Sequence, residues 1–271
     1  MRELSISESL PIFRVAIWTV HFGIGNDGLY SSQRIADAIK LLNVDVIGLL
    51  ETDAMRIVMG NRDLPLSINQ YLNYHISYGP STLNHTWGCS LISRYPIVSV
   101  KNYNLPSPDG EIACAIHATL NITNYLVDVV EETPLDRKLQ SEMLAKLISS
   151  ISRPVIFLGY VVAKPHSEEY HRLFEKQGSL GPLVDIDETD NDRWCQYIGF
   201  KGNNIHKMTY ARISHARISD TEIQAASFTV LSLKSDPMSE YLKRLTFSQK
   251  LFNARSEDEH YFHYVRYFYA E

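Results

Sequence analysis

Short apolar runs rich in β-branched residues recur along the chain and alternate with segments of helical periodicity. Residues 14–20 (RVAIWTV) and 44–50 (VDVIGLL) predict two buried strands, because each run is mostly apolar and too short for a helix. The segment between them carries an apolar stripe at i, i+4 and i+7 spacing, which predicts a helix. The stripe comprises Ile35, Ile39 and Leu42. A strand, a helix and a strand in this order favour a βαβ unit with parallel strands.

The rest of the chain carries further strand-like segments separated by turn residues. They cover 88–98, 111–122, 124–130, 154–160, 193–200 and 226–233, and the second and third look like a hairpin. A second helix is predicted after Thr133-Pro134, with an apolar face at i+4 spacing. That face comprises Leu135, Leu139, Met143 and Leu147. The pattern favours the α/β class, as a sandwich of two sheets packed face to face with helices outside.

Composition supports one large globular domain. The chain has 271 residues, of which 45% are apolar, and this excludes a disordered chain. We expect the domain to cover residues 1–234 and an aromatic-rich extension to cover 235–271. The run YFHYVRYFY at 261–269 is expected to pack on the body as a closing strand, with a peptide or membrane-interface contact as the alternative. The net charge of −5 argues against broad binding to nucleic acid, which is not expected as a partner.

The three cysteines, Cys89, Cys114 and Cys195, show no zinc or CxxC spacing. We expect no disulfide framework from them and interpret them as small buried apolar residues. No signal peptide is expected at the N-terminus, and no apolar run approaches the length of about 20 residues that a bilayer span needs.

Glu51 directly follows the predicted strand 44–50. Ligands bind at the carboxyl ends of strands in such sheets, and Mg²⁺ prefers one or two carboxylates together with water and phosphate oxygens. Glu51 is therefore the candidate ligand for Mg²⁺ (or Mn²⁺). A solvated acid at a strand end is the alternative interpretation.

Polar residues that can move protons or hold phosphate lie beside other strand ends. His21 and His85 lie in loops next to strands and could exchange protons near neutral pH, although a structural role is the alternative for each. Asp220 precedes the last core strand, where it could orient a base or bind a metal. Asp192 and Arg193 begin another strand, and an arginine can bind a phosphate through two parallel hydrogen bonds.

Many segments spread along the chain closely resemble one known family. They include HFGIGNDG, DVIGLLETDA, YGPSTLNHTWG, LISRYPIV, LPSPDGEIACAI, VIFLGY, DIDETDNDRWCQYI and YARISHARISDTEIQ. The chain resembles the endonuclease/exonuclease/phosphatase superfamily, whose fold is a four-layered α/β/β/α sandwich of the DNase I-like type. More specifically, it resembles the C-terminal domain of the Cwh-type proteins that remodel the lipid of glycosylphosphatidylinositol (GPI) anchors, whose animal counterpart is the PGAP2-interacting protein.

The resemblance implies a role in GPI-anchor lipid remodelling, in which the fungal protein exchanges diacylglycerol for ceramide. Superfamily chemistry implies metal-assisted attack on a phosphodiester. By position, Glu51 would be the metal ligand, and His85, His21 and Asp220 would be catalytic. Trp87, Asp192 and Arg193 would bind the substrate, which is a GPI anchor or an inositol phospholipid.

The same resemblance bears on the partner and the compartment. Because relatives carry many transmembrane helices before this domain, it implies a membrane-embedded partner subunit. It also implies a membrane-associated protein of the endoplasmic reticulum or Golgi, with a cytoplasmic location as the alternative.

The chain departs from the superfamily pattern at several catalytic positions. Thr19 replaces the usual asparagine after the first-strand tryptophan, and Gly159–Val162 lacks both polar groups of the usual Gly-Asp-x-Asn. Thr221 replaces the histidine after the final aspartate, and Gln196 replaces another aspartate.

A further departure concerns the connection after the strand 124–130. The strand leads directly into EETPLDRKLQ, where relatives place a histidine-bearing loop. Two functions therefore stay open besides a minor third one. The first is a metal-assisted phosphodiesterase or transferase, and the second is a catalytically degenerate module that binds GPI lipid, glycan or a partner protein. The third is a soluble nuclease.

Overall fold

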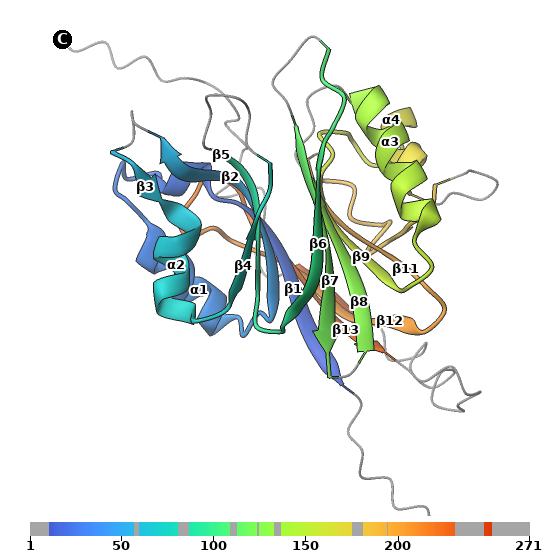
Figure 1. The fold of residues 1–271 in the computed structure, drawn as a ribbon, viewed down its shortest axis with the longest axis horizontal. Helices are drawn as coiled ribbons and strands as arrows, with labels where there is room; N and C mark the ends of the chain where they lie inside the picture. The colour runs from blue at the N-terminus through green and yellow to red at the C-terminus, as the bar shows by residue number, and fades with distance from the viewer. Residues whose placement is uncertain are drawn as a thin grey trace, which may run out of the picture.

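The computed structural model describes residues 11–56, 60–80, 87–108, 113–123, 125–132, 137–174, 181–193, 195–230 and 247–250. Two mixed β-sheets pack face to face, and helices cover their outer faces (Figure 1). This confirms the predicted α/β class and the α/β/β/α sandwich. In the described part of the chain, no helix is long and apolar enough to cross a membrane.

The first sheet has the strand order β14-β12-β13-β1-β2-β5-β4, with the short β3 paired to β2. Its strands are β1 (Ile12–Thr19), β2 (Val46–Arg56), β3 (Arg62–Asp63), β4 (His75–Tyr78), β5 (Trp87–Ser93), β12 (Ile205–Ile213), β13 (Ile223–Val230) and β14 (Phe247–Lys250). The helices α1 (Ser32–Leu41) and α2 (Leu64–Leu72) pack on it. β1 and β2 run parallel on either side of α1, as the βαβ pattern predicts.

The second sheet has the strand order β10-β11-β9-β8-β7-β6. Its strands are β6 (Ile97–Asn104), β7 (Cys114–Ile122), β8 (Tyr125–Glu132), β9 (Val155–Tyr160), β10 (Val184–Asp185) and β11 (Gln196–Lys201). The helices α3 (Arg137–Ser150) and α4 (Glu168–Leu173) cover its outer face. β7 and β8 form the predicted antiparallel hairpin, and β8 and β9 form a second parallel pair around α3.

Several element boundaries differ from the expectations. The segment 88–98 is not one strand, because the turn around Pro96 separates β5 from β6, and the two strands belong to different sheets. The strand β12 and the helices α2 and α4 have no counterpart in the sequence prediction. β14 lies in the expected extension and pairs with β12, whereas the aromatic run 261–269 lies outside the described residues.

The predicted buried face of the second helix is wrong by one position. Leu139 is 44% exposed and Met143 is only partly buried, whereas Leu144 and Ile148 are fully buried. The buried row begins at Gln140, whose Nε2 donates to the carbonyl of Pro106 at 3.0 Å. Because the first buried position of this face is a glutamine, the spacing of apolar residues does not indicate the buried face correctly.

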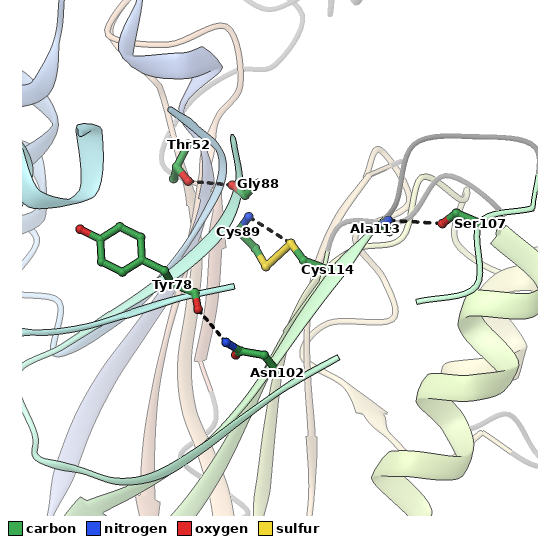
Figure 2. Close-up of a disulfide and its surroundings, with 8 residues drawn as sticks. All are labelled: Thr52, Tyr78, Gly88, Cys89, Asn102, Ser107, Ala113 and Cys114. Atoms are coloured by element: carbon green, nitrogen blue, oxygen red, sulfur yellow. Dashed lines mark hydrogen bonds between the residues drawn. A yellow bond between two sulfur atoms is a disulfide. The ribbon is translucent and has the colours of Figure 1, made fainter. Parts of the chain in front are cut away.

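All three cysteines are buried, as predicted, but the expectation of no disulfide is wrong. Cys89 of β5 and Cys114 of β7 form a disulfide that joins the two sheets, with 6.4 Å between their Cα atoms (Figure 2). They are 25 positions apart in the sequence, and spacing alone does not reveal that two different sheets bring them together. Cys195 is free and buried, as expected.

Candidate functional site

The end of β1, the middle of β2, the end of β9, the start of β11 and the turn before β13 meet at one end of the sandwich and carry the polar residues of the candidate site. Thr19 ends β1, Glu51 lies in β2, and Tyr160 ends β9. Gln196 begins β11, and Asp220 lies in the turn that leads into β13. Because β1 and β2 are parallel, their carboxyl ends share this edge, which is where open α/β sheets bind ligands.

Glu51 occupies a break in the regular pairing of β2 with β5. The register shifts between Leu49 and Thr52, and Glu51 has a positive φ of 53°, which is uncommon for a residue with a side chain. Beside the break, the Thr52 hydroxyl donates to the Gly88 carbonyl at 2.8 Å (Figure 2). A bulge of this kind redirects a side chain, and strained backbone of this type clusters at functional sites.

The carboxyl groups of Glu51 and Asp220 lie close enough to influence each other. Burial, and to a smaller extent the negative charge of Asp220, raise the pKa of Glu51 from 4.5 to about 7. Two acids from opposite ends of the sequence are therefore gathered in one poorly solvated place. For these two residues, the structure brings together what the sequence singled out.

Asp220 is held by hydroxyl groups on either side of it in the chain. The Thr221 hydroxyl donates to Asp220 Oδ1 at 3.1 Å. The Ser219 hydroxyl lies 3.3 Å from the same oxygen and donates to the Thr19 carbonyl at 2.6 Å. These contacts tie the turn before β13 to the end of β1 and fix the position of the Asp220 carboxylate.

Two of the positions that depart from the superfamily pattern contact each other directly. Gln196 Oε1 accepts hydrogen bonds from the backbone nitrogen of Thr19 at 2.9 Å and from its hydroxyl at 3.3 Å. Gln196 Nε2 donates to the Glu222 carbonyl at 3.0 Å. Both residues are buried, so an uncharged amide here satisfies the polar groups of three strand ends without a counter-ion.

Tyr160 and Cys195 are two site residues that the sequence reasoning did not propose. Tyr160 pairs with Gln196 in the register of β9 and β11 and is almost fully buried. Burial raises the pKa of its hydroxyl well above the usual value, and the neighbouring Cys195, Glu51 and Asp220 raise it further. The position of Tyr160 at the end of the predicted buried strand 154–160 was the available signal.

The two candidate histidines are placed differently. His21 begins the short 3₁₀ turn η1 (His21–Gly23) after β1, and its Nδ1 lies 3.2 Å from the carbonyl oxygen of Ile24. Its loop reaches the edge beside Glu51, because Val20 N donates to the Leu50 carbonyl. His85 lies outside the described residues. The backbone of Trp87 pairs with Asp53, and its side chain also lies outside what is described.

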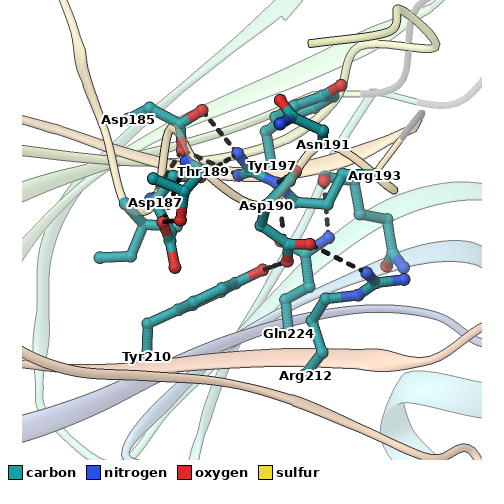
Figure 3. A network of polar contacts seen from close by, with 12 residues as sticks. Asp185, Asp187, Thr189, Asp190, Asn191, Arg193, Tyr197, Tyr210, Arg212 and Gln224 are labelled. Carbon is teal, nitrogen blue, oxygen red and sulfur yellow. Dashed lines mark hydrogen bonds and ion pairs between the residues drawn. The ribbon is translucent and has the colours of Figure 1, made fainter. Parts of the chain in front are cut away.

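Arg193 does not serve as an open phosphate ligand in this structure, contrary to the expectation. Its side chain is fully buried, and two of its nitrogen atoms donate to the Asp185 carboxylate at 2.8 Å (Figure 3). Its Nε also donates to the Asp190 carbonyl at 3.0 Å. All three guanidinium nitrogens are thus used inside the protein, whereas the neighbouring Asp192 is exposed.

The network around Arg193 continues to the candidate site. Asp190 accepts from Arg212 at 3.1 Å, and Arg212 donates to Glu222 at 2.8 Å (Figure 3 shows the first of these contacts). Glu222 in turn raises the pKa of Cys195, although burial is the larger cause. The alternating charges therefore form a buried chain from the loop after β10 to the start of β13.

The donor set of the site suits a hard divalent cation, although it is small. Within the ranges that the structure describes, no group of three or more His, Cys, Asp or Glu residues is arranged for a metal. Glu51 and Asp220 still supply two carboxylates in a desolvated place, and Mg²⁺ is often bound by one or two carboxylates with water and phosphate oxygens. The donor chemistry thus fits the expected ion.

Comparison with known proteins decides the family. A family model described as the C-terminal nuclease-like domain of PGAP2IP matches residues 11–254. The chain belongs to this family. The protein cwh43 of Schizosaccharomyces pombe is 44% identical over 225 residues, which cover 81% of this chain and 23% of cwh43. The chain therefore spans about a quarter of the length of this curated relative.

Solved structures place the PGAP2IP-type domain in the DNase I-like fold. An endonuclease/exonuclease/phosphatase from Beutenbergia cavernae has a TM-score of 0.65 at 18% identity, covering 81% of this chain and 72% of its own. One from Bacteroides vulgatus has the same TM-score at 14% identity, covering 81% and 99%. The human Nocturnin catalytic domain, solved with a bound sulfate anion, has a TM-score of 0.59 at 17% identity, covering 82% and 96%.

Proposed function

We propose that this domain acts on the phosphate-bearing headgroup of a GPI anchor or an inositol phospholipid during lipid remodelling, as a metal-assisted phosphodiesterase or transferase. Membership of the PGAP2IP family and the likeness to cwh43 support the lipid-remodelling role. The observation that carries the chemical part is the pair of carboxylates, Glu51 and Asp220, at the strand ends.

The case for a cation rests on the electrostatics of this pair. Burial disfavours the ionised form of Glu51, and repulsion from Asp220 adds to this, so the pKa of Glu51 rises to about 7. A Mg²⁺ or Mn²⁺ ion would neutralise the carboxylates and the phosphate together, and it would polarise the phosphate for attack. In this proposal Glu51 binds the ion and Asp220 lies beside it, fixed by the hydroxyls of Ser219 and Thr221.

Proton transfer in the same proposal falls to the histidines. His21 stands in the loop after β1, beside the strand end that carries Glu51, and an imidazole can exchange protons near neutral pH. His85 precedes β5 in the chain and has the same proposed role. Asp192 is exposed and stays a proposed substrate contact, as does Trp87.

A second function is favoured by the uncharged residues of the site. Gln196, Thr221 and Tyr160 stand where the superfamily pattern carries two acids and a histidine, and Gln196 is fully used in holding Thr19 and Glu222. A site with these groups can bind a metal-chelated headgroup without cleaving it. The alternative proposal is therefore a module that binds GPI lipid or glycan, or a partner protein.

One set of measurements separates the two functions. Thermal unfolding of the chain with and without millimolar Mg²⁺ or Mn²⁺ should show a rise in Tm that E51Q and D220N lose. The exposed Glu168 of α4 offers a matched control, E168Q, which should keep the rise. Incubation with phosphatidylinositol or GPI in mixed micelles, followed by mass spectrometry, should show cleaved or exchanged lipid that E51Q does not form.

The outcomes have distinct meanings. Cation-dependent lipid binding without product would support the binding module instead of the enzyme. No rise in Tm together with no lipid binding would contradict both proposals. Nicking of supercoiled plasmid DNA would support the nuclease, which we do not propose because the chain carries a net charge of −5.

The cellular setting is part of the same proposal. We propose membrane association in the endoplasmic reticulum or Golgi together with a membrane-embedded partner, because cwh43 is more than four times as long as the matched region. A cytoplasmic location is the alternative. Fractionation of cells that express the chain with and without the remainder of a cwh43-type protein would distinguish them.

A further inference from the structure

Two exposed leucines and two exposed arginines lie beside the candidate site, on two loops, on β3 and in the first turn of α2. Leu29 is 64% exposed, and Leu66, in the first turn of α2, is 47% exposed. Arg62 of β3 and Arg217 of the turn before Asp220 are also exposed. We call these four residues the rim surface.

Contacts within the protein hold the rim surface together around the loop 24–30. The Arg62 guanidinium lies 4.6 Å from the ring centre of Tyr30, next to Leu29 in the chain. On the other side of the loop, the backbone nitrogen of Asn26 donates to the Arg217 carbonyl at 3.0 Å. The loop 24–30 thus lies between Arg62 and Arg217, and it carries Leu29, the more exposed of the two leucines.

The rim surface lies within reach of the carboxylate pair. Arg217 precedes Asp220 by three positions, and Arg62 pairs with Arg56, five positions beyond Glu51 along β2. At about 3.3 Å per residue, Arg62 is within roughly 20 Å of Glu51. When a lipid headgroup enters the site while its acyl chains stay in the membrane, the rim surface would therefore contact the membrane.

The net charge of the rim surface and its nearest acids is positive, because the two arginines outweigh the one acid that has no basic partner there. Asp27 accepts from Arg34 at 2.7 and 3.1 Å, so this pair adds no net charge. Asp63 caps α2 through Leu66 N and accepts from the Tyr78 hydroxyl, but it keeps its negative charge. Arg62, Arg217 and Asp63 together therefore carry a net charge of 2 − 1 = +1. Arg62 and Arg217 thus present positive charge beside exposed leucines, on a chain whose total charge is −5.

We propose that the rim surface docks the domain onto an anionic lipid surface, with Leu29 and Leu66 entering the headgroup region and Arg62 and Arg217 facing the acidic lipids. The proposal rests on the lipid substrate of the proposed function and adds the way in which the site reaches it. Apolar side chains with adjacent basic residues bind such surfaces through buried apolar area and attraction to anionic lipids.

Vesicle flotation tests the docking surface directly. The chain should float with phosphatidylcholine vesicles that contain phosphatidylserine, more than with phosphatidylcholine alone, and added salt should reduce the difference. R62Q and R217Q should each weaken partitioning about fivefold, since a basic residue near such a surface contributes a factor of this size. L29E/L66E should weaken it tenfold or more, because two apolar contacts become charged.

A matched control comes from the opposite end of α1. Leu41 is 86% exposed but ends the helix whose first turn lies near the site, so L41E should float like the unmodified chain. Equal loss in L41E, or unchanged flotation of L29E/L66E, would overturn the proposal. Flotation that is equally strong without anionic lipid and unaffected by R62Q and R217Q would do the same. A chain that floats with no vesicle but captures a purified protein through these residues would show a protein-docking face instead.

Failure of this inference can be told apart from failure of the proposed function. None of the four residues belongs to the candidate site, so the rise in Tm with Mg²⁺ should persist in every rim variant. Turnover or binding of a short-chain phosphatidylinositol below its micelle concentration should persist as well. If the rim variants bind vesicles normally while E51Q loses the Tm response, only the docking proposal falls.

Discussion

At the scale of single residues, the site is defined by how two acids are solvated. Glu51 was recognisable from the sequence because it follows a buried strand, but its bulged backbone and its proximity to Asp220 were not. These features depend on the pairing of β2 with β5 and on a turn 169 positions further along the chain, since 220 − 51 = 169. The chemistry of the residue is therefore a tertiary property.

The raised pKa of Glu51 gives stability a definite dependence on pH. The folded chain holds a proton on Glu51 between its usual pKa of 4.5 and about 7, whereas the unfolded chain releases it. Stability should therefore be greatest below pH 4.5 as far as this group is concerned, and should fall by roughly 3 kcal/mol in total as the pH rises from 4.5 to above 7. E51Q should lack this fall and be more stable than the parent at pH 8 without metal.

Urea denaturation at pH 5 and pH 8 measures this effect. E168Q, which changes an exposed acid, should follow the parent at both values. If E51Q shows the same pH dependence as the parent, Glu51 is solvated and its pKa is not raised. The argument for a cation at Glu51 would then fail.

The same scale shows how far residue chemistry can be inferred without a structure. Arg193 looked like a phosphate ligand because arginines often are, yet Asp185 pairs with both ends of its guanidinium. An arginine in a buried ion pair and an arginine that binds a phosphate cannot be distinguished from the sequence. Only the burial of the strand ends around Arg193 distinguishes them.

At the scale of elements, the predictions succeeded where one apolar pattern dominates. Strands β1, β2, β8 and β9 contain apolar runs, and α1 has a clear apolar stripe, so these elements and the parallel pair of β1 and β2 were predicted. The parallel pairing of β8 with β9 was not predicted. β12 was missed because IHKMTYARI does not alternate strictly between apolar and polar residues, and its pairing with β13 has a register shift between Lys207 and Thr209. The buried face of α3 was misassigned because Gln140 heads it.

The face of α3 can be tested by paired substitutions. Leu144 is fully buried against the second sheet, so L144A should lower the free energy of unfolding by about 2–5 kcal/mol. Leu139 is 44% exposed, so L139A should change it by about 0.5 kcal/mol or less. The urea midpoints of the two variants give the comparison, and a larger effect at Leu139 would restore the face that the sequence predicts.

At the scale of the whole molecule, two ties join the sheets on different sides of the candidate site. The disulfide between Cys89 and Cys114 links β5 to β7. The buried chain of charges links the loop after β10, in the second sheet, to β12 and β13 in the first. Sequence spacing could not reveal either tie, because each depends on how the sheets stack. The site thus lies between two fixed points, which keeps Glu51, Tyr160 and Asp220 in register.

Asp190 is the central member of the charged tie, and its removal should loosen the junction of the sheets. It accepts from the Tyr210 hydroxyl and from Arg212, both at 3.1 Å, and its side chain is 1% exposed. D190N leaves Arg212 partly uncompensated in a buried place, which should cost about 3–5 kcal/mol of stability. E188Q changes an exposed acid of the same loop and should leave stability nearly unchanged.

The D190N variant should also lose part of its Tm response to Mg²⁺, even under conditions where it stays folded. The reason is that Arg212 also binds Glu222, whose carbonyl accepts a hydrogen bond from Gln196 of the site. If D190N is as stable as E188Q, the buried network of ion pairs does not contribute to stability. Packing of the two sheets would then be sufficient to position the site residues.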